Sequence, residues 1–515
     1  MKWLKKGIKF ATKHWKITEL KDKQIELIDN IFNGNDTIGL LPTGYGKSLC
    51  YLLPPLLCKK VMIIISPLIA LMDDQKDSLA KKEIKCAVLH SNNKNRSDEI
   101  QEILNGNIYI VYMSPEYLVK TTDSEDEDEI NFCGGMKLAR SLYKKNMLGF
   151  LAVDESHCCS AWGNDFRPEY KEIKVFRDNF PDIPIMAVTA TATTKVCKDI
   201  AKMLHLDTPI LVKGSFDRPN INISIMEIPS VSVYNPKSRR YTDKMESNKN
   251  LVLPYIKKYN DAQIIIYIEN KDLCEELASD LTIVGIKASA YHAGFSAKKR
   301  EDIQSKFINN EYNIIISTTA FGMGIDMTIR CVIIIGCPKS IEEYYQQIGR
   351  AGRDNLACEA VLFFDYSKYI KNIFFLKQEK NPILHKVKDF NLKETSRYAY
   401  TTLCRRRHIL EYFDEECNFL NCNNCDNCSD LVDITLCYND MIKEKSSFIN
   451  IKNKLLQPYM NKKGKLVEFN LADLLQKWKY YGSKNNLMIP RKFLIQEKKE
   501  DIVVDIYDKF EKLLV

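Results

Sequence analysis

The sequence lacks any hydrophobic run of the roughly 18 residues that a transmembrane helix needs. Its N-terminal segment Met1–Phe10 carries charge but has no apolar core of a secretory signal. These absences predict a soluble intracellular protein and do not distinguish nucleus from cytoplasm. Thiols stay reduced in either compartment, so the 17 cysteines are not expected to form a disulfide framework.

What the chain does contain is ordinary for a globular protein. Its 515 residues are 45% hydrophobic and 28% charged. A length of this kind predicts about three or four domains. The formal net charge of +8 permits a polyanionic partner without requiring one.

Short apolar runs alternate with longer amphipathic stretches, which is typical of a parallel sheet with crossover helices. The alternation pauses over Asp217–Asn260, where Pro, Asn, Ser and Lys dominate, and then resumes. We therefore predict two α/β domains joined near Ser215–Ile221. The predicted strands are Thr37–Leu41, Val61–Ile65, Ile108–Tyr112, Phe150–Val153, Ile185–Val188, Ile264–Ile268, Ile314–Ser317 and Cys331–Ile335.

Two segments stand apart from this pattern. Asp123–Glu129 is nearly all acidic and is predicted to be a solvated loop insertion. After Ser429 the periodicity weakens, and only Gly464–Trp478 and Asp501–Leu514 are predicted to be helical. We expect a short α-rich region over residues 431–515, with a reduced winged-helix module as one interpretation.

A glycine-rich turn, Leu-Pro-Thr-Gly-Tyr-Gly-Lys-Ser over residues 41–48, follows the first predicted strand and precedes an apolar helix. Such a turn presents N–H groups to phosphate oxygens, and the helix adds its positive N-terminal end. Lys47 can reach the β and γ phosphates of a nucleotide, and Ser48 can hold Mg²⁺. Leu41 stands where the general pattern has glycine, so this motif alone leaves an accidental turn open. The predicted nucleotide-binding residues are Thr43, Gly44, Tyr45, Gly46, Lys47 and Ser48.

An acidic pair follows the apolar strand Leu148–Val153. Asp154 lies where the C-terminal end of a parallel strand can hold Mg²⁺, and Glu155 can orient or deprotonate an attacking water. An acidic pair in a loop is often plain solvated surface. Because this pair follows a buried strand and accompanies a phosphate loop, the two motifs together predict hydrolysis of a nucleoside triphosphate.

The motifs of Glu19–Ser429 resemble the RecQ branch of the superfamily-two helicases of the Asp-Glu-x-His type. Gln24 matches the glutamine that reads adenine in that family. Ser66 begins the motif that touches the nucleic-acid strand. The resemblance implies that hydrolysis is coupled to movement along the strand through His157, Thr189 and Thr191.

The segment Ser156–Tyr170 looks like the aromatic-rich loop that is the most specific feature of this family. Trp162 and Phe166 can stack on an unpaired base, and Arg167 can pair with a phosphate. The loop leaves the predicted Mg²⁺-binding end of the strand directly, so a bound strand could shift Glu155. The alternative interpretation places the two aromatic residues in the hydrophobic core.

The second α/β domain carries further motifs of the family, Tyr291–Gly294, Ser317–Asp326 and Tyr345–Arg353. Gln346, Arg350 and Arg353 lie at helical spacing, so we expect them to face one cleft. The resemblance implies that both arginines reach the ATP phosphates across the gap between the domains. An arginine used in this way is worth roughly 10³–10⁵ in rate. A solvated basic helix face is the alternative.

The sequence also departs from the family pattern. Leu20 and Lys21 stand where the family usually has Phe and Arg, and Ile334 and Gly336 stand where it usually has His and Asp. No departure removes a predicted catalytic group. They indicate a divergent member, whose substrate preference cannot be carried over.

Five cysteines gather between residues 404 and 428. The spacing Cys-x-x-Cys-x-x-Cys over 422–428 suits either an iron–sulfur cluster or zinc. Together with Cys404 it resembles the RecQ zinc-binding module, and four thiolates suit a structural, tetrahedral Zn²⁺. The family spacing favours Cys404, Cys422, Cys425 and Cys428 as ligands and leaves Cys417 as the spare.

The sequence therefore predicts an ATP-dependent DNA helicase that uses ATP, Mg²⁺ and Zn²⁺. We expect it to move along single-stranded DNA and to unwind tailed duplexes, from 3′ to 5′ by resemblance, and we expect no membrane partner. The alternatives are an RNA helicase, an ATPase that translocates without strong unwinding, and a strand-binding scaffold without turnover. The predicted domains are 1–215, 216–370, a zinc module over 371–430, and 431–515. The predicted catalytic residues are Lys47, Asp154, Glu155, Arg350 and Arg353.

Overall fold

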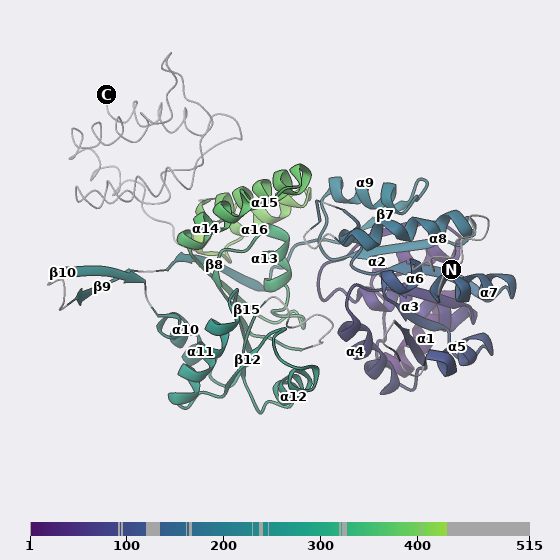
Figure 1. Cartoon of the computed structure of the whole chain (residues 1–515), viewed down its shortest axis with the longest axis horizontal. Helices are drawn as coiled ribbons and strands as arrows, with labels where there is room; N and C mark the ends of the chain where they lie inside the picture. Colours follow the sequence, from purple (N-terminus) through teal and green to yellow (C-terminus); the bar gives the residue numbers. More distant parts are fainter. Residues whose placement is uncertain are drawn as a thin grey trace, which may run out of the picture.

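The computed structural model describes residues 2–90, 93, 96–119, 134–160, 162–163, 167–228, 230–235, 240–245, 247–318, 321, 327–401 and 403–429. These residues form two parallel-sheet α/β domains that lie next to each other, with a group of helices above the second domain (Figure 1). The predictions for Phe166, for 123–129, for most of 317–326 and for 431–515 fall outside the described residues. Among the helices that the described residues form, none is long and apolar enough to cross a bilayer.

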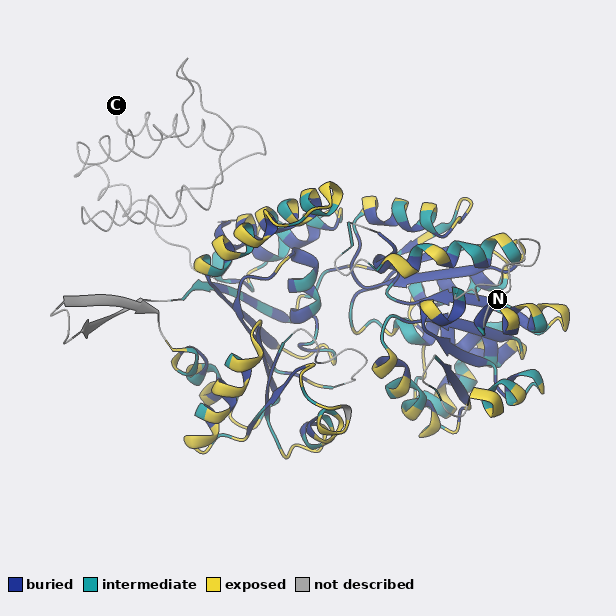
Figure 2. Ribbon diagram, viewed as in Figure 1, coloured by how far each residue is buried: buried dark blue, intermediate teal, exposed yellow. Residues whose placement is uncertain are grey.

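A sheet of seven parallel strands, in the order β3-β4-β2-β5-β6-β1-β7, forms the first domain. Its strands are largely buried because helices cover both faces (Figure 2). The strands are β1 (Thr37–Leu40), β2 (Val61–Ile65), β3 (Cys86–Leu89), β4 (Ile110–Met113), β5 (Leu148–Val153), β6 (Ile185–Thr189) and β7 (Ile210–Lys213). The helices are α1 (Trp3–Trp15), α2 (Asp22–Phe32), α3 (Lys47–Cys58), α4 (Ile69–Ala80), α5 (Arg96–Leu104), α6 (Pro115–Val119), α7 (Gly135–Lys144), η1 (Ser156–Cys159), η2 (Pro168–Ile173), α8 (Lys174–Asn179) and α9 (Thr194–Met203).

The second domain has six parallel strands in the order β12-β13-β11-β14-β15-β8. A separate two-stranded hairpin, β9 (Ser230–Asn235) with β10 (Arg240–Met245), follows β8 in the chain. The other strands are β8 (Ile221–Glu227), β11 (Ile264–Ile268), β12 (Ala288–Tyr291), β13 (Ile314–Ser317), β14 (Cys331–Gly336) and β15 (Cys358–Phe364). The helices are α10 (Asn248–Lys258), α11 (Lys271–Ile283), α12 (Ala297–Ile308) and α13 (Ile341–Ile348).

The strand order of the first sheet brings three predicted motifs to one edge. Strands β5, β6 and β1 are consecutive neighbours and run parallel, so their C-terminal ends lie side by side. The phosphate loop follows β1, the acidic pair follows β5, and Thr189 ends β6. In parallel sheets, ligands bind beyond the C-terminal ends of the strands. The fold therefore assembles a site from segments that lie far apart in the sequence.

The helices α14 (Tyr366–Leu376), α15 (Pro382–Tyr400), α16 (Arg405–Tyr412) and α17 (Asp426–Ser429) follow the second sheet. Arg405 is fully buried here and forms a two-pronged ion pair with Asp426, with Nε–Oδ1 and Nη2–Oδ2 distances of 2.9 and 3.1 Å. Asp426 also accepts the backbone N–H of Ile225 in β8 at 3.0 Å. The group of helices α14–α17 is thereby attached to β8, the edge strand of the second domain.

The expected pause over Asp217–Asn260 is only partly a pause. It contains β8, which completes the second sheet, the hairpin β9–β10, and the whole of α10. Strand β8 was missed because its residues alternate between buried and half-buried, as an edge strand requires, and do not form one apolar run. Strands β3, β7, β12 and β15 were not predicted either.

Candidate nucleotide and nucleic-acid site

Two glycines shape the phosphate loop between β1 and α3. Gly44 and Gly46 have φ angles of 82° and 90°, a region that residues with a Cβ rarely adopt. A Cβ at Gly46 would in addition lie 2.7 Å from Nε2 of Gln24. The turn leads directly into the N-terminus of α3, whose first N–H groups have no partner within the helix and suit a phosphate.

Gln24 connects the start of α2 to this loop. Its Oε1 accepts the N–H of Lys21 at 2.9 Å. Its Nε2 donates to the carbonyl oxygens of Tyr45 and Gly46 at 3.2 and 3.1 Å. The Lys21 ammonium lies 4.6 Å from the centre of the Tyr45 ring. Three side chains that differ in chemistry, an amide, an amine and an aromatic ring, thus gather at one end of the loop.

Lys47, the first residue of α3, interacts electrostatically with the acidic pair. Its Nζ donates to the carbonyl oxygen of Leu41 at 3.2 Å. Desolvation lowers the pKa of Lys47, while the carboxylates of Glu155 and Asp154 oppose that shift. Burial raises the pKa of Asp154 to about 7, with the charge of Glu155 adding to the rise and Lys47 opposing it. A divalent cation placed here would favour the ionised carboxylates.

The hydroxyl of Tyr51, which sequence reasoning missed, joins the two predicted Mg²⁺ ligands. It lies 3.1 Å from Oδ2 of Asp154 and 3.2 Å from Oγ of Ser48. Ser48 and Asp154 therefore present oxygen atoms to the same small region, and oxygen is the donor that Mg²⁺ prefers. The donor set fits that ion. The available signal was the position of Tyr51, one turn after Ser48 on α3.

The acidic pair is connected to β6 through His157. Glu155 has a φ angle of 48°, an unusual conformation for a residue with a side chain. Nδ1 of His157 lies 2.8 Å from Oγ1 of Thr189 and 3.3 Å from Oε2 of Glu155. His157 is buried between the two groups. A displacement of Thr189 can therefore be transmitted to Glu155 through the imidazole ring of His157.

The second domain contacts the first at Thr191, two residues after β6. Nε2 of Gln346, on α13, donates to Oγ1 of Thr191 at 3.1 Å. The backbone N–H of Thr191 in turn lies 3.3 Å from Oγ1 of Thr189. A continuous polar path therefore runs from Glu155 through His157, Thr189 and Thr191 to the second domain.

Arg353 lies near the phosphate loop, but the expectation that Arg350 and Arg353 lie on a helix is wrong. Helix α13 ends at Ile348, and Gly349 is its C-cap. The two arginines lie in the turn that follows, where Gly352 has a φ angle of 55°. A Cβ at Gly44 would lie 3.2 Å from Cγ of Arg353. Burial lowers the pKa of Lys47 most, and the positive charges of both arginines lower it further.

The described part of the aromatic-rich loop folds back onto the domain surface. A Cβ at Gly163 would overlap the carbonyl oxygen of His157, so the close approach needs glycine. The Lys195 ammonium lies 2.7 Å from the centre of the Trp162 ring. The ring of Phe390, on α15, packs edge to face against the Trp162 ring, with the two ring centres 6.3 Å apart. Trp162 is only half-buried and packs at the margin of the core. Part of the Trp162 side chain is therefore exposed to solvent.

Two other residues predicted to meet nucleic acid are held by protein contacts. Nη1 of Arg167 donates to the carbonyl oxygen of Pro67 at 2.6 Å. Ser66, which directly follows β2, is fully buried, and its N–H donates to the carbonyl oxygen of Met113 at 3.1 Å. The Ser66 side chain is therefore not exposed to a strand in this structure.

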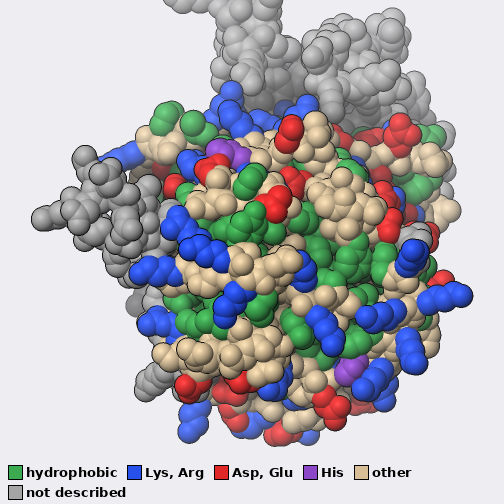
Figure 3. Space-filling model, turned by 90° about the vertical axis from the view of Figure 1, so that its right-hand side faces the viewer, with side chains coloured by type: hydrophobic (Ala, Val, Ile, Leu, Met, Phe, Trp, Pro, Cys, Tyr) green, Lys and Arg blue, Asp and Glu red, His purple; other side chains and the backbone are tan. Residues whose placement is uncertain are grey.

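Lysines and arginines are scattered over the face of the first domain that is turned away from the second (Figure 3).

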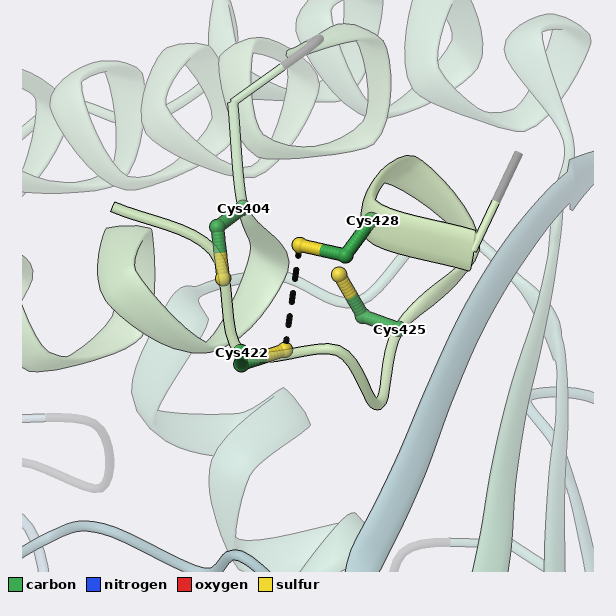
Figure 4. A group of neighbouring side chains, drawn as sticks. All are labelled: Cys404, Cys422, Cys425 and Cys428. Atoms are coloured by element: carbon green, nitrogen blue, oxygen red, sulfur yellow. Dashed lines mark hydrogen bonds between the residues drawn. The ribbon is translucent and has the colours of Figure 1, made fainter. Parts of the chain in front are cut away.

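The four cysteines favoured by the spacing come together. The sulfur atoms of Cys404, Cys422, Cys425 and Cys428 all lie within 4.8 Å of one another, and their side chains point inward (Figure 4). Those of Cys422 and Cys428 are 3.9 Å apart. A tetrahedral site with Zn–S bonds of about 2.3 Å needs sulfur atoms about 3.8 Å apart, so this donor set fits zinc. Cys417 is not in the group, and its thiol points to the carbonyl oxygen of Phe419 at 3.3 Å.

Three family models match the chain in succession. The DEAD/DEAH box helicase model matches residues 21–200, the helicase conserved C-terminal domain matches residues 243–355, and the RecQ zinc-binding model matches residues 367–429. The three matches follow the order of the two α/β domains and the zinc module.

Curated relatives extend this similarity over most of the chain. A putative ATP-dependent RNA helicase of Acanthamoeba polyphaga mimivirus is 37% identical over 78% of this chain and 69% of its own length. A putative ATP-dependent DNA helicase of Caenorhabditis briggsae is 32% identical over 92% of this chain and 74% of its own length. The ATP-dependent DNA helicase RecQ of Pasteurella multocida is 36% identical, and the match covers 76% of this chain and 57% of that protein.

Solved structures show the same fold at low sequence identity. The helicase MrfA in its crystal structure with DNA has a TM-score of 0.55 and 17% identity, covering 96% of this chain and 58% of that one. The match with its complex with DNA and AMPPNP gives a TM-score of 0.54 at 18% identity. The matched models and the relatives, together with the two parallel-sheet domains and the cysteine cluster, show that the chain belongs to the RecQ family of superfamily-two ATP-dependent helicases.

Proposed function

We propose that this chain is a DNA helicase that couples ATP hydrolysis to translocation along a single strand and to unwinding of a duplex. One observation carries the proposal. The side chain of Arg353 from the second domain lies against Gly44 of the phosphate loop, which is the loop that leads into Lys47. A triphosphate in this cleft would meet cationic groups from both domains. Hydrolysis would remove the terminal phosphate that these groups contact together, and this would weaken the attraction between the two domains.

The proposed roles follow from chemistry. Lys47 and the N-terminus of α3 bind the β and γ phosphates. Ser48 and Asp154 hold Mg²⁺, which when bound neutralises phosphate charge. Glu155 orients the attacking water and accepts its proton, because it follows the Mg²⁺ ligand directly. Arg350 and Arg353 stabilise the charge that develops on the transferred phosphoryl group. We propose domain limits of 1–215, 216–370 and 371–430 for this machinery.

The path from Glu155 to Gln346 supports a mechanism of coupling. Each domain contributes residues to it, so a movement of one domain alters the hydrogen bond between Gln346 and Thr191. Trp162 follows the short helix η1 that carries His157, and its partly exposed ring can stack on an unpaired base. A shift of Trp162 on binding of a strand would thereby be transmitted through His157 to Glu155. We propose 3′-to-5′ movement from family membership.

An RNA helicase is the second candidate. The mimivirus relative, 37% identical, is named as an RNA helicase, whereas the other two relatives described above are named as DNA helicases. The match to a RecQ zinc-binding module favours DNA. The choice is a matter of substrate, because the same nucleotide cleft serves either strand.

The test is a matched panel of tailed duplexes. DNA and RNA duplexes of one sequence, each with a 3′ or a 5′ tail, are incubated with the full chain, ATP and Mg²⁺ at one fixed salt concentration, since phosphate contacts make affinity depend on salt. The proposal predicts strand separation of the 3′-tailed DNA above all others. Preferential separation of RNA would establish the second candidate. ATP consumption without separation of any duplex would reduce the proposal to a translocase.

A further inference from the structure

Arg218 touches both walls of the nucleotide cleft, although neither the sequence motifs nor the roles proposed above include it. Its Nη1 donates to the carbonyl oxygen of Thr43 in the phosphate loop at 3.3 Å. Its Nη2 donates to the carbonyl oxygens of Ala351 and Gly352 at 2.8 and 3.0 Å. One half-buried guanidinium therefore joins the loop that would bind phosphate to the turn that carries Arg350 and Arg353.

The position of Arg218 in the chain gives this contact its importance. It lies in the short linker between β7, the last strand of the first sheet, and β8, the edge strand of the second. The backbone N–H of Gly214 donates to Leu40 at 2.8 Å, which fixes the start of the linker to β1 beside the phosphate loop. A residue at the pivot moves little when two domains rotate about it. Its contacts can persist while more distant groups approach or separate.

The arginine turn is fastened on its other side as well. Nδ2 of Asn220 donates to the carbonyl oxygens of Gly352 and Leu356 at 2.8 and 3.1 Å. The N–H of Gly352 donates to Ile329 at 2.9 Å. Anchored on both sides, the turn has little freedom to move independently of Arg218. A displacement of Thr43 would therefore move the Arg218 guanidinium, and the guanidinium would in turn move the turn that carries Arg353.

We propose that Arg218 is a positioning residue that sets the place of Arg350 and Arg353 relative to the phosphate loop. This inference rests on the proposed ATP hydrolysis. Both terminal nitrogens of Arg218 donate to carbonyl oxygens, so it holds the two walls rather than the nucleotide. A planar guanidinium presents its donors in a fixed fork, and this is what spans two oxygens of one domain and one of the other. A lysine has one ammonium and cannot reproduce that fork.

The test is a double-mutant cycle with ATP hydrolysis and ATP affinity as separate readouts. Arg218→Gln, Arg218→Lys, Arg353→Ala and the two double variants are compared with wild type, with single-stranded DNA held at saturation. We expect Arg218→Gln to lower kcat by about 10²-fold, the effect expected of a misplaced catalytic group, with a change in KM below about threefold. In the Arg353→Ala background the same substitution should lower kcat by a clearly smaller factor, because the part of its effect that acts through Arg353 is already lost and only the part through Arg350 remains. Arg218→Lys should rescue kcat only in part.

Arg330→Gln is the matched control. Arg330 also donates to backbone carbonyls of this segment, those of Leu356 and Ala357 at 3.2 Å each, and pairs with Asp354, but none of these partners belongs to the first domain. Its effect should be the same with and without Arg353. Thermal midpoint and zinc content are measured for every variant to verify folding.

The outcomes separate the inference from the function on which it rests. Equal losses from Arg218→Gln in both backgrounds, a rise in KM alone, or full rescue by lysine would each overturn the positioning role while leaving the proposed ATPase intact. Absence of ATP hydrolysis in the wild-type chain would overturn the proposed function and the inference with it.

Discussion

Gln346 donates a hydrogen bond to Thr191 across the gap between the two domains, with Nε2 and Oγ1 3.1 Å apart. We expect Gln346→Ala to reduce the stimulation of ATP hydrolysis by single-stranded DNA by about two- to thirteenfold, the value of one hydrogen bond of about 0.5–1.5 kcal/mol. The measurement is the ratio of the ATPase rate with DNA to the rate without it.

A cycle with Thr191→Val tests whether this loss belongs to the hydrogen bond. If it does, the double variant should be no worse than either single variant. Gln378→Ala, at an exposed position after α14, is the matched control and should behave as wild type. Fully additive losses would show that the two residues act independently.

Removal of one zinc ligand should unfold the zinc module. A structural zinc contributes roughly 10–16 kcal/mol of apparent binding energy, and a short segment with little core depends on it. Cys422→Ser is therefore expected to lose bound zinc and to become sensitive to proteolysis between residues 404 and 429. Metal analysis and limited proteolysis measure both effects.

Cys417→Ser is the control for that experiment, since Cys417 lies in the same segment but outside the group of four. It should bind zinc as the wild type does. Loss of zinc from Cys417→Ser with retention in Cys422→Ser would show that the ligand set is wrong.

Glu342 should make stability depend on pH. It is buried on α13 and accepts the hydroxyl of Tyr412 in the zinc module at 2.7 Å. Burial raises the pKa of Glu342 above its ordinary value of 4.5. The folded chain thus holds this proton at pH values where the unfolded chain has released it. The contribution of Glu342 to the free energy of unfolding is therefore present below pH 4.5 and is lost as the pH rises through the raised pKa.

Glu342→Gln keeps an acceptor for Tyr412 but cannot ionise. We expect the variant to have the higher thermal midpoint at about pH 8 and the difference from wild type to shrink toward about pH 5, where more of the wild-type side chain is protonated. A difference that is constant over this range, or one that grows as the pH falls, would contradict the assignment.

Glu415 is expected to hold the linker between the domains. Its Oε1 accepts the hydroxyl of Ser215 at 2.6 Å, and its Oε2 accepts the N–H of Phe216 at 2.7 Å. Glu415→Ala leaves the Phe216 N–H without its partner, which costs about 1–3 kcal/mol for a buried group. A lower thermal midpoint should result, measured beside Glu416→Ala, whose exposed side chain serves as the control. Equal midpoints for the two variants would rule out a role for Glu415.

The sequence is most informative where the signal is local. The phosphate loop, the strand before Asp154 and the cysteine spacing are short contiguous patterns, and the structure has the strands and the four sulfur atoms as predicted. The order β5-β6-β1 could not be predicted, because strand order depends on packing between distant segments. The edge strand β8 was missed because half-exposed strands lack an apolar run.

The arrangement between the domains was the least accessible to sequence reasoning. The contact of Arg218 with Thr43 and Gly352 joins residues more than a hundred positions apart on either side, and no motif marks it. The turn that carries Arg350 and Arg353 was expected to be helical because the spacing alone permits it. The helix instead ends at Ile348 with Gly349 as its C-cap, and the turn that follows is held by hydrogen bonds of Gly352 with Ile329 and Asn220, which lie far away in the sequence.

The most direct test of the account is ATP hydrolysis by the full chain with and without single-stranded DNA, for the wild type and for Lys47→Ala. The account predicts hydrolysis by the wild type that DNA stimulates, and a loss of at least about 10²-fold in the variant, because the β and γ phosphates lose their cationic partner. Failure of the wild type to consume ATP with DNA present, or equal rates for the two proteins, would contradict it.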